Sequence, residues 1–239
     1  EEGVLSSREN NYLASLLGCD NRVGVSFLDL STGEFWISEY SGKKAWEEVQ
    51  SELAHFRPRE IILPENDGAM FQKRLPEDLR QNLVHTVQED WTFDCAHARR
   101  VLLDHFQVST LEGFGVNGQR EAVSAGGSLL HYVRKTQKVS LDHITGVRLL
   151  ENCKYLKIDE TSARNLELIH EADGTRRWTL LSVLDFTHTA MGARLLRQWI
   201  LRPALNLKEI LGRQDAVAEM QSSLVQMEHL GRRLDSVQD

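Results

Sequence analysis

Three acidic residues give this sequence one arrangement that could carry metal-dependent chemistry. Asp29 lies at the end of a predicted strand, before a turn at residues 31–33. Phosphodiester cleavage by two metal ions needs several carboxylates around a pair of divalent cations about 4 Å apart. Glu65 and Asp90 are the only plausible partners, and both fall in predicted loops. We therefore expect Asp29 to be a solvated turn acid, and a metal-dependent nuclease remains the enzymatic alternative.

Glycines at positions 113, 115 and 118 match the Gly-x-Gly-x-x-Gly spacing of a dinucleotide-binding turn. That turn needs a buried strand before it and a helix start after it to hold a pyrophosphate. The segment here follows a predicted helix, so we interpret it as a loop between elements. The sequence also lacks a Gly-x-x-x-x-Gly-Lys-[Ser/Thr] phosphate loop and a Gly-x-Ser-x-Gly nucleophile elbow. We predict neither nucleotide-binding nor catalytic residues in this chain.

Metal-ligating side chains are scattered along the sequence. Cys95 and His97 are two residues apart on a predicted helix, so they point to different faces. The nine histidines and three cysteines form neither an H-E-x-x-H nor a C-x-x-C spacing. We therefore predict no metal site and no bound cofactor, and the cysteine usage favours a reducing cytoplasmic compartment. No apolar run approaches the roughly 20 residues of a membrane helix, so no membrane contact is expected.

The charges of the 239-residue chain are unevenly distributed. Residues 1–120 carry 12 basic and 20 acidic side chains, a net charge of −8, whereas residues 121–239 carry 16 and 15. An acidic first half repels phosphate, so it is a poor nucleic-acid binder by itself. It is better suited to docking another protein.

The hydrophobic pattern of the first half is that of a mixed α/β sheet. Alternating apolar residues predict an antiparallel hairpin over 23–37, joined by a strand over 12–17. A helical stripe over 46–56 precedes a run at 60–63 that reads as a strand covered on both faces. The later elements expected are a short helix at 68–75, a strand at 83–87 and a helix that begins at Asp94 as its N-cap.

Beyond Glu121 the pattern is helical. Met191, Leu195, Leu196 and Trp199 form one apolar stripe, which we expect to be buried, with about 1.5–3 kcal/mol gained per large side chain. Asn206, with Glu209 three residues later, predicts a capping box for the next helix. The last stripe is still in phase near Asp239, and position 1 is not Met, which favours an internal fragment of a longer chain.

Several blocks at fixed spacing identify a family. Residues 155–168, 179–192, 194–203 and 213–217 follow one another as in the start of the core, or lever, domain of MutS-type DNA mismatch-repair proteins, which this region closely resembles. Residues 28–35, 113–115 and 125–132 resemble the connector domain of the same family. The resemblance implies a ribonuclease-H-like, non-catalytic α/β connector domain over 1–138 and the first part of an all-α core domain over 139–239.

The resemblance also implies what this chain does not contain. Family members read a mismatch with the Phe of a Phe-x-Glu motif and hydrolyse ATP with Mg²⁺ at a phosphate loop, and neither motif is present. The implied role is a non-catalytic piece that relays ATP state and docks the partner MutL. Mismatched DNA would be bound through other domains of a homodimeric parent. A family paralogue that acts on recombination intermediates is the other alternative, beside a ribonuclease-H-like nuclease.

The candidate relay residues belong to the core-domain blocks. We expect Asp185 and Thr187 to cap the helix that carries the apolar stripe, and Gly192 to permit a close helix crossing. Arg194 and Arg197 are three residues apart and would form a polar ridge. The full candidate set is Asp159, Arg164, Asn165, Asp185, Thr187, Met191, Gly192, Arg194 and Arg197.

Overall fold

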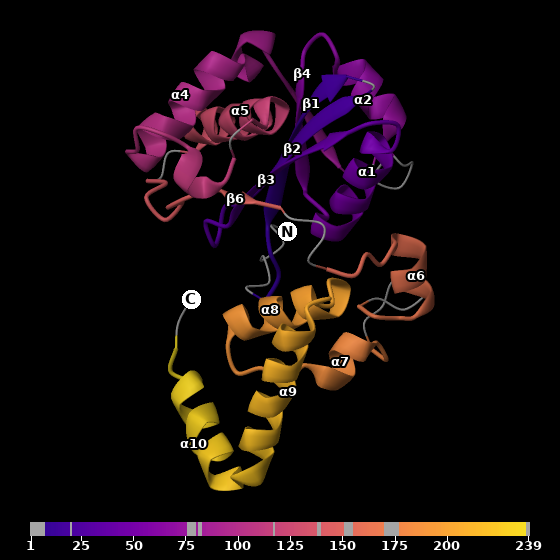
Figure 1. Cartoon of the computed structure of the whole chain (residues 1–239), viewed down its shortest axis with the longest axis vertical. Helices are drawn as coiled ribbons and strands as arrows, with labels where there is room; N and C mark the ends of the chain where they lie inside the picture. The colour runs from indigo at the N-terminus through magenta and orange to yellow at the C-terminus, as the bar shows by residue number, and fades with distance from the viewer. Residues whose placement is uncertain are drawn as a thin grey trace, which may run out of the picture. The chain divides into compact units, whose positions relative to one another are not determined.

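The chain forms two compact units, residues 11–151 and residues 1–10 with 152–239. The computed structural model describes residues 8–19, 21–75, 80, 83–116, 118–137, 140–150, 155–169 and 177–237. We call the first unit the α/β unit and the second the helical unit (Figure 1). The chain passes between the two units twice, after Asn10 and after Glu151.

A six-stranded sheet forms the centre of the α/β unit. Its strand order is β5-β4-β1-β2-β3-β6, with β2 antiparallel to both β1 and β3 and the other neighbours parallel. The strands are β1 (Tyr12–Cys19), β2 (Arg22–Asp29), β3 (Phe35–Ser41), β4 (Glu60–Pro64), β5 (Val84–Gln88) and β6 (Arg148–Leu149).

Helices cover both faces of this sheet (Figure 1). One apolar cluster joins α1 (Ala45–Phe56) and α2 (Gly68–Arg74) to the sheet, and the other joins α4 (Cys95–Phe106) and α5 (Arg120–Thr136) to it. Successive strand residues point to opposite faces, so Val25 and Phe27 belong to the first cluster and Leu28 to the second. Short 3₁₀ turns precede the two helices of the second face, η1 (Asp90–Phe93) and η2 (Glu112–Phe114).

Two glycines let α5 pack closely. A Cβ atom on Gly127 would lie 2.4 Å from the Cα and the carbonyl oxygen of Ala98 on α4. A Cβ on Gly24 of β2 would lie 2.1 Å from the carbonyl group of Glu121. Only glycine fits such approaches, because backbone atoms cannot move aside as a flexible side chain can.

The elements predicted for the α/β unit are confirmed, including the strand at Glu60–Pro64 that is buried on both faces. Asp94 is the N-cap of α4, since its carboxylate accepts hydrogen bonds from the amides of Ala96 and His97 at 3.0 Å.

The unit boundary differs from the expected division at 138/139. Residues 140–150 belong to the α/β unit because β6 extends the sheet beside β3, and Ile144 and Val147 are buried in its core.

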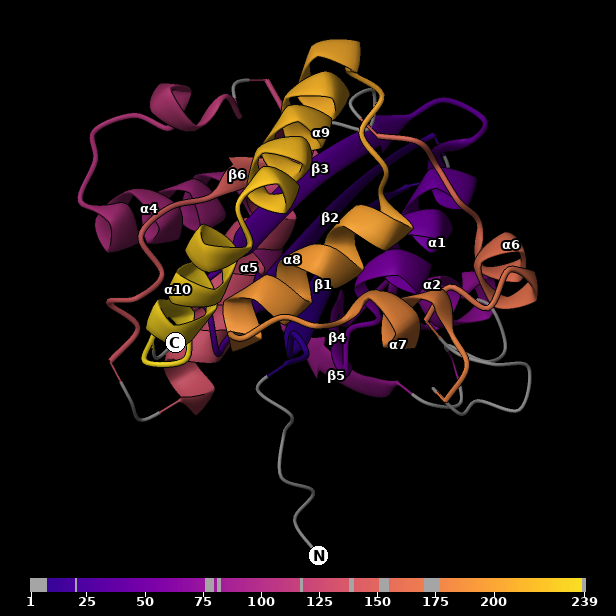
Figure 2. The ribbon, with the colours of Figure 1, turned by 90° about the horizontal axis from the view of Figure 1, so that it is seen from below.

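The helical unit contains α6 (Glu160–Asn165), α7 (Leu180–Leu184), α8 (Ala190–Leu201), α9 (Leu207–Ser222) and α10 (Leu224–Leu234). The last two helices form a hairpin, which Figure 2 shows from a second direction. Asn206 caps α9 as predicted, accepting hydrogen bonds from the amides of Lys208 and Glu209. His188 Nδ1 lies 2.7 Å from an Asp235 carboxylate oxygen and ties the end of α10 to the segment before α8.

The apolar stripe of α8 is only partly buried, which corrects the sequence prediction. Met191, Leu195 and Trp199 expose 45%, 44% and 39% of their surface, whereas Ala193 is buried. The Arg213 guanidinium lies 3.7 Å from the centre of the Trp199 ring, so part of this face is covered by a cation–π contact instead of by apolar side chains. The stripe therefore gains less burial energy within the described residues than its sequence predicts.

Candidate functional site

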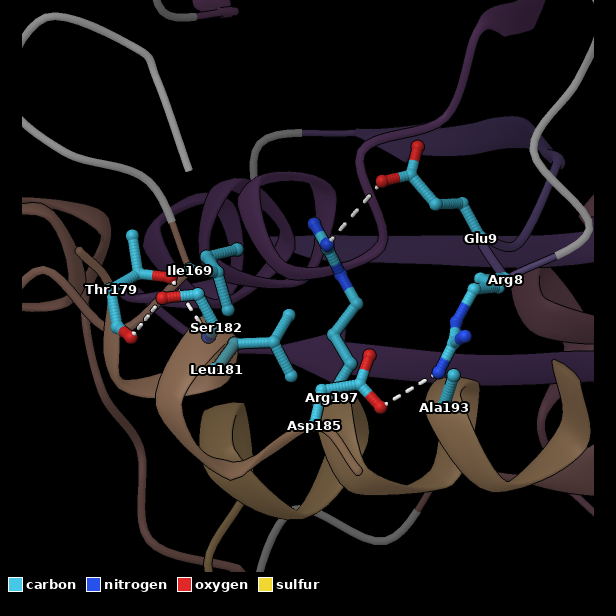
Figure 3. A pocket seen from close by; sticks show the side chains of 9 residues that line it. All are labelled: Arg8, Glu9, Ile169, Thr179, Leu181, Ser182, Asp185, Ala193 and Arg197. Carbon is cyan, nitrogen blue, oxygen red and sulfur yellow. Dashed lines mark hydrogen bonds and ion pairs between the residues drawn. The ribbon is translucent and has the colours of Figure 1, made fainter. Parts of the chain in front are cut away.

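A polar network in the helical unit centres on Arg8. Its Nη2 atom donates hydrogen bonds to Asp185 Oδ1 at 2.9 Å, to Thr187 Oγ1 at 2.7 Å and to the Thr187 carbonyl oxygen at 3.1 Å. The neighbouring Glu9 forms an ion pair with Arg197 of α8, with 3.7 Å between Oε1 and Nη1. We call these five residues the polar clasp. It fixes residues 8 and 9 to the α7–α8 segment, as Figure 3 shows.

The electrostatics of the polar clasp favour an ionised Asp185. Partial burial by itself would raise the pKa of the Asp185 carboxyl. Hydrogen bonds from the Thr187 hydroxyl at 2.5 Å and the Thr187 amide at 3.2 Å, together with the Arg8 guanidinium, outweigh this effect. The net result is a pKa below the ordinary value of 3.8, so the carboxylate is charged at neutral pH.

A cavity of about 210 Å³ lies beside the polar clasp. Four of the five clasp residues line it, and its other walls come from the segment before α7, from α7 and from α8. Figure 3 shows Arg197 reaching toward Glu9 and Arg8 reaching toward Asp185. The cavity is therefore bounded by two guanidinium–carboxylate pairs.

The α7–α8 segment is shaped by local hydrogen bonds that differ from the predicted ones. The N-cap of α8 is Thr189, whose hydroxyl accepts a hydrogen bond from the Gly192 amide at 3.0 Å. Asp185 and Thr187 do not cap this helix as predicted, because their side chains bond to each other and to Arg8. Gly192 does not serve a helix crossing either. A Cβ there would lie 3.1 Å from Thr189 Oγ1 and 3.4 Å from Thr187 Cβ, so Gly192 makes room for this turn.

Of the six predicted candidates that lie outside the polar clasp, three belong to α6 and its N-cap. Asp159 is the N-cap of α6 and accepts hydrogen bonds from the amide and hydroxyl of Ser162, both at 2.8 Å, which lower its pKa. Arg164 and Asn165 are exposed at the end of the same helix. The segment after α6 does reach the clasp region, since Leu181 donates a backbone hydrogen bond to the carbonyl of Leu168.

The polar ridge predicted on α8 is split in the structure. Arg197 belongs to the polar clasp, whereas Arg194 does not line the cavity. Met191 is partly exposed on this helix and is not among the residues that line the cavity. Asp185, Thr187 and Arg197 are thus brought together in the polar clasp, and Gly192 packs against Thr187.

Arg8 and Glu9 were missed by the sequence analysis. They lie before the first strand, and their partners lie 177 and 188 positions further along the chain. No local periodicity links residues so far apart. The usable signal is chemical: a basic and an acidic side chain stand side by side just before β1, and an acid and a base recur in the α7–α8 region.

The three carboxylates of the nuclease alternative do not converge. Asp29 pairs with Tyr12 at the end of the sheet where β4 begins, whereas Glu65 follows the opposite end of β4, about 15 Å further along the strand. Asp90 accepts hydrogen bonds from the amide and side chain of Asn66. Across the described residues, no three His, Cys, Asp or Glu side chains are grouped so that they could hold a metal ion.

Asp29 is a turn residue, as predicted, but it is not solvated. It is fully buried, and its Oδ1 atom accepts hydrogen bonds from the amide of Ser31 at 2.8 Å and from the Ser31 hydroxyl at 2.6 Å. The Asp29 carbonyl also accepts from the Gly33 amide at 2.9 Å. The carboxylate therefore stabilises the β2–β3 turn.

The remaining candidate motifs occupy ordinary structural positions. Gly113 and Gly115 lie in and after η2, which follows α4 and not a strand, so the interpretation as a loop is confirmed. The His97 ring contacts the rings of Trp91 and His131, with centroids 4.8 and 5.3 Å away. None of the helices in the described part of the chain has the length and apolar character needed to cross a bilayer.

Comparison with known proteins matches both units to one family. The family model of MutS domain II matches residues 11–145, and that of MutS domain III matches residues 161–239. The chain is 36% identical over 98% of its length to the DNA mismatch repair protein MutS of Protochlamydia amoebophila, and 37% identical over its full length to that of Solibacter usitatus. It is 39% identical over 94% of its length to that of Desulfosudis oleivorans.

The chain thus combines a mixed-sheet α/β unit with a helical unit, and a MutS domain model matches each of them. The chain belongs to the MutS family of DNA mismatch repair proteins. It spans about a quarter of the length of these curated relatives, 27% of the first two and 25% of the third.

Proposed function

We propose that this chain is a non-catalytic connector and lever in a mismatch-recognition ATPase of the MutS type. The observation that carries the proposal is the polar clasp, which bonds residues 8 and 9 to the α7–α8 segment. In this role the chain supplies stiffness and defined attachment points, and the reactive groups for ATP hydrolysis belong to other parts of the protein.

The mechanical argument rests on connectivity. Tyr12, the first residue of β1, follows Glu9 by three residues, a link of at most about 11 Å when fully extended. A displacement of α7 and α8 that pulls on the clasp therefore pulls on the start of β1. Because the chain also returns after Glu151, the helical unit holds the α/β unit by two covalent connections. Two connections restrict rotation more than a single flexible linker does.

The wider role follows from family membership and is part of the same proposal. ATP with Mg²⁺ would act in a separate domain of a homodimeric cytoplasmic protein, and mismatched DNA would be bound by domains outside this chain. The α/β unit would dock MutL. Its sequence supports protein docking better than DNA binding, since residues 11–151 carry 15 basic and 20 acidic side chains, a net charge of −5.

A chimera tests the proposal. This chain replaces the matching segment of the Solibacter usitatus protein, to which it aligns over its full length. We expect the chimera to lower the mutation rate of a strain that lacks mismatch repair and to show ATP turnover that mismatched DNA stimulates. Asp185→Ala in the chimera should reduce this stimulation about fivefold or more, in the range of typical coupling free energies. Mismatch affinity should change little.

The matched control is Asp215→Ala, which removes an exposed carboxylate from α9 of the same unit. It should leave both the stimulation and the mutation rate as they are in the parent chimera. Equal effects of the two substitutions would contradict a relay through the polar clasp. A chimera that processes recombination intermediates but does not repair mismatches would favour the paralogue alternative.

A further inference from the structure

The cavity beside the polar clasp has the walls of a small-molecule site. Its volume of about 210 Å³ is below the roughly 300–1,000 Å³ of pockets that hold drug-sized ligands, so its occupant must be small. The lining residues in the described part of the chain belong to the helical unit.

One wall of the cavity carries equal numbers of opposite charges. The Arg197–Glu9 pair has its atoms 3.7 Å apart, whereas the Arg8–Asp185 pair is in hydrogen-bond contact at 2.9 Å. The longer distance exceeds that of a direct hydrogen bond, so a polar group of a ligand can bridge these two side chains. The described residues of this wall include two cations and two anions, so beside them a ligand with a net charge would leave one charge uncompensated.

The other wall is aliphatic. Ile169 and Ala193 are 5% and 4% exposed. In Figure 3, Leu181 of α7 lies between Ile169 and the charged pairs, and Ala193 of α8 lies close to Arg8. A branched aliphatic group placed here would be removed from water without losing a hydrogen bond. The charged wall and the aliphatic wall face the same small volume, so they select one molecule that carries both features.

We propose that this cavity binds a small zwitterion with a branched aliphatic side chain, a free amino acid of the leucine type. The ligand carboxylate would accept hydrogen bonds from the Arg197 guanidinium, and the ligand ammonium would donate to Glu9. The side chain would pack on Ile169, Leu181 and Ala193. The proposal concerns binding to the helical unit and holds whether or not the clasp relays ATP state.

The test is a titration of the 239-residue chain with L-leucine, followed by NMR of the methyl groups of Ile169 and Leu181 and by calorimetry. We expect saturable binding with a dissociation constant of about 1 mM or tighter, as suits a ligand of this size. Isovalerate lacks the ammonium group and isoamylamine lacks the carboxylate, so each should bind about tenfold more weakly or not at all. L-Aspartate, which carries a net charge, should not bind.

Two variants locate the binding site. Arg197→Gln should weaken leucine binding about tenfold, and Ala193→Leu should abolish it by filling the cavity. Arg194→Gln removes a guanidinium from the same helix outside the cavity and should leave binding unchanged. Circular dichroism tests whether each variant is folded. If Arg197→Gln is not folded it is replaced by Arg197→Lys, and if Ala193→Leu is not folded it is replaced by Ala193→Val.

Three outcomes would overturn the proposal. The first is no saturable binding of leucine to the folded chain. The second is binding of isovalerate or isoamylamine as tight as that of leucine, which would show that the cavity does not require a zwitterion. The third is binding that survives both Arg197→Gln and Ala193→Leu, which would place the ligand elsewhere on the molecule.

Discussion

The Arg8 guanidinium and the Asp185 carboxylate, 177 positions apart in sequence, lie 2.9 Å apart in the helical unit. Arg8 also bonds to both oxygens of Thr187, so one side chain holds three acceptors of the turn between α7 and α8. This places the residues that precede β1 with the helical unit and not with the sheet that they lead into. The clasp therefore lies just before the first of the two places at which the chain passes between the units, after Asn10.

Loss of the charge on Asp185 should destabilise the helical unit. In Asp185→Asn the amide keeps the size of the carboxylate but cannot match its charge-assisted bonds to Arg8 and Thr187, so we expect a loss of about 1–2 kcal/mol in the free energy of unfolding. Urea denaturation followed by far-ultraviolet circular dichroism measures it. Asp215→Asn on α9 is the exposed control and should change stability by less than about 0.5 kcal/mol. Similar losses in both variants would show that Asp185 is merely another surface acid.

The close approach of α4 and α5 should be sensitive to one methyl group. Gly127→Ala would place a Cβ 2.4 Å from backbone atoms of Ala98, so the helices must separate, at a cost of about 2–3 kcal/mol. Gly113→Ala is the matched control, because its Cβ would meet nothing within 4 Å and its backbone is not left-handed. Urea denaturation followed by tryptophan fluorescence should separate the two variants. A Gly127→Ala protein as stable as the Gly113→Ala protein would contradict the observed helix packing.

Local patterns were sufficient to predict the α/β unit. Val23, Val25 and Phe27 alternate because one face of β2 packs on α1, and the spacing of Trp46, Val49 and Leu53 follows the buried face of α1. Such periodicity records which side of an element is buried, and it can be read from one segment by itself. The unit boundary was misplaced because β6 has only two residues, too few for a strand pattern.

The polar clasp could not be predicted in the same way. Asp185, Thr187 and Thr189 all have residue types that can cap the N-terminus of a helix. Residue type therefore does not decide which of them caps α8, and in the structure it is Thr189. Asp185 and Thr187 bond to Arg8 instead of capping α8, and only the position of Arg8 in the folded chain decides this. The exposure of Met191 and Trp199 also depends on what packs against α8, which an apolar stripe does not specify.

Asp29 should act in folding and not in catalysis. Asp29→Asn weakens the acceptor that holds the Ser31 amide and hydroxyl in a buried turn, so we expect a loss of about 1 kcal/mol in stability. The unsubstituted chain should cleave neither RNA nor DNA when Mg²⁺ or Mn²⁺ is added. A gel-based cleavage assay with and without EDTA checks this expectation. Metal-dependent cleavage that disappears in Asp29→Asn would instead establish the nuclease alternative.

The α/β unit should lose stability in mildly acidic solution because of His105. Its Nε2 atom donates to the Ile144 carbonyl and its Nδ1 atom accepts from the Arg134 guanidinium, both at 2.9 Å, so the ring is neutral in the folded state. Burial, with the nearby Arg134 charge, holds the pKa of His105 below its ordinary value of 6.5. The contribution of the neutral His105 ring to stability is therefore complete above about pH 6.5 and is lost as the pH falls through the lowered pKa.

Urea denaturation at a series of pH values from 7.5 down to about 5 should therefore show a free energy of unfolding that falls with the pH. His105→Gln should be less stable at pH 7.5 but have a shallower pH dependence, whereas His229→Gln, an exposed change on α10, should retain the full slope. An unchanged slope in His105→Gln would remove His105 as the source.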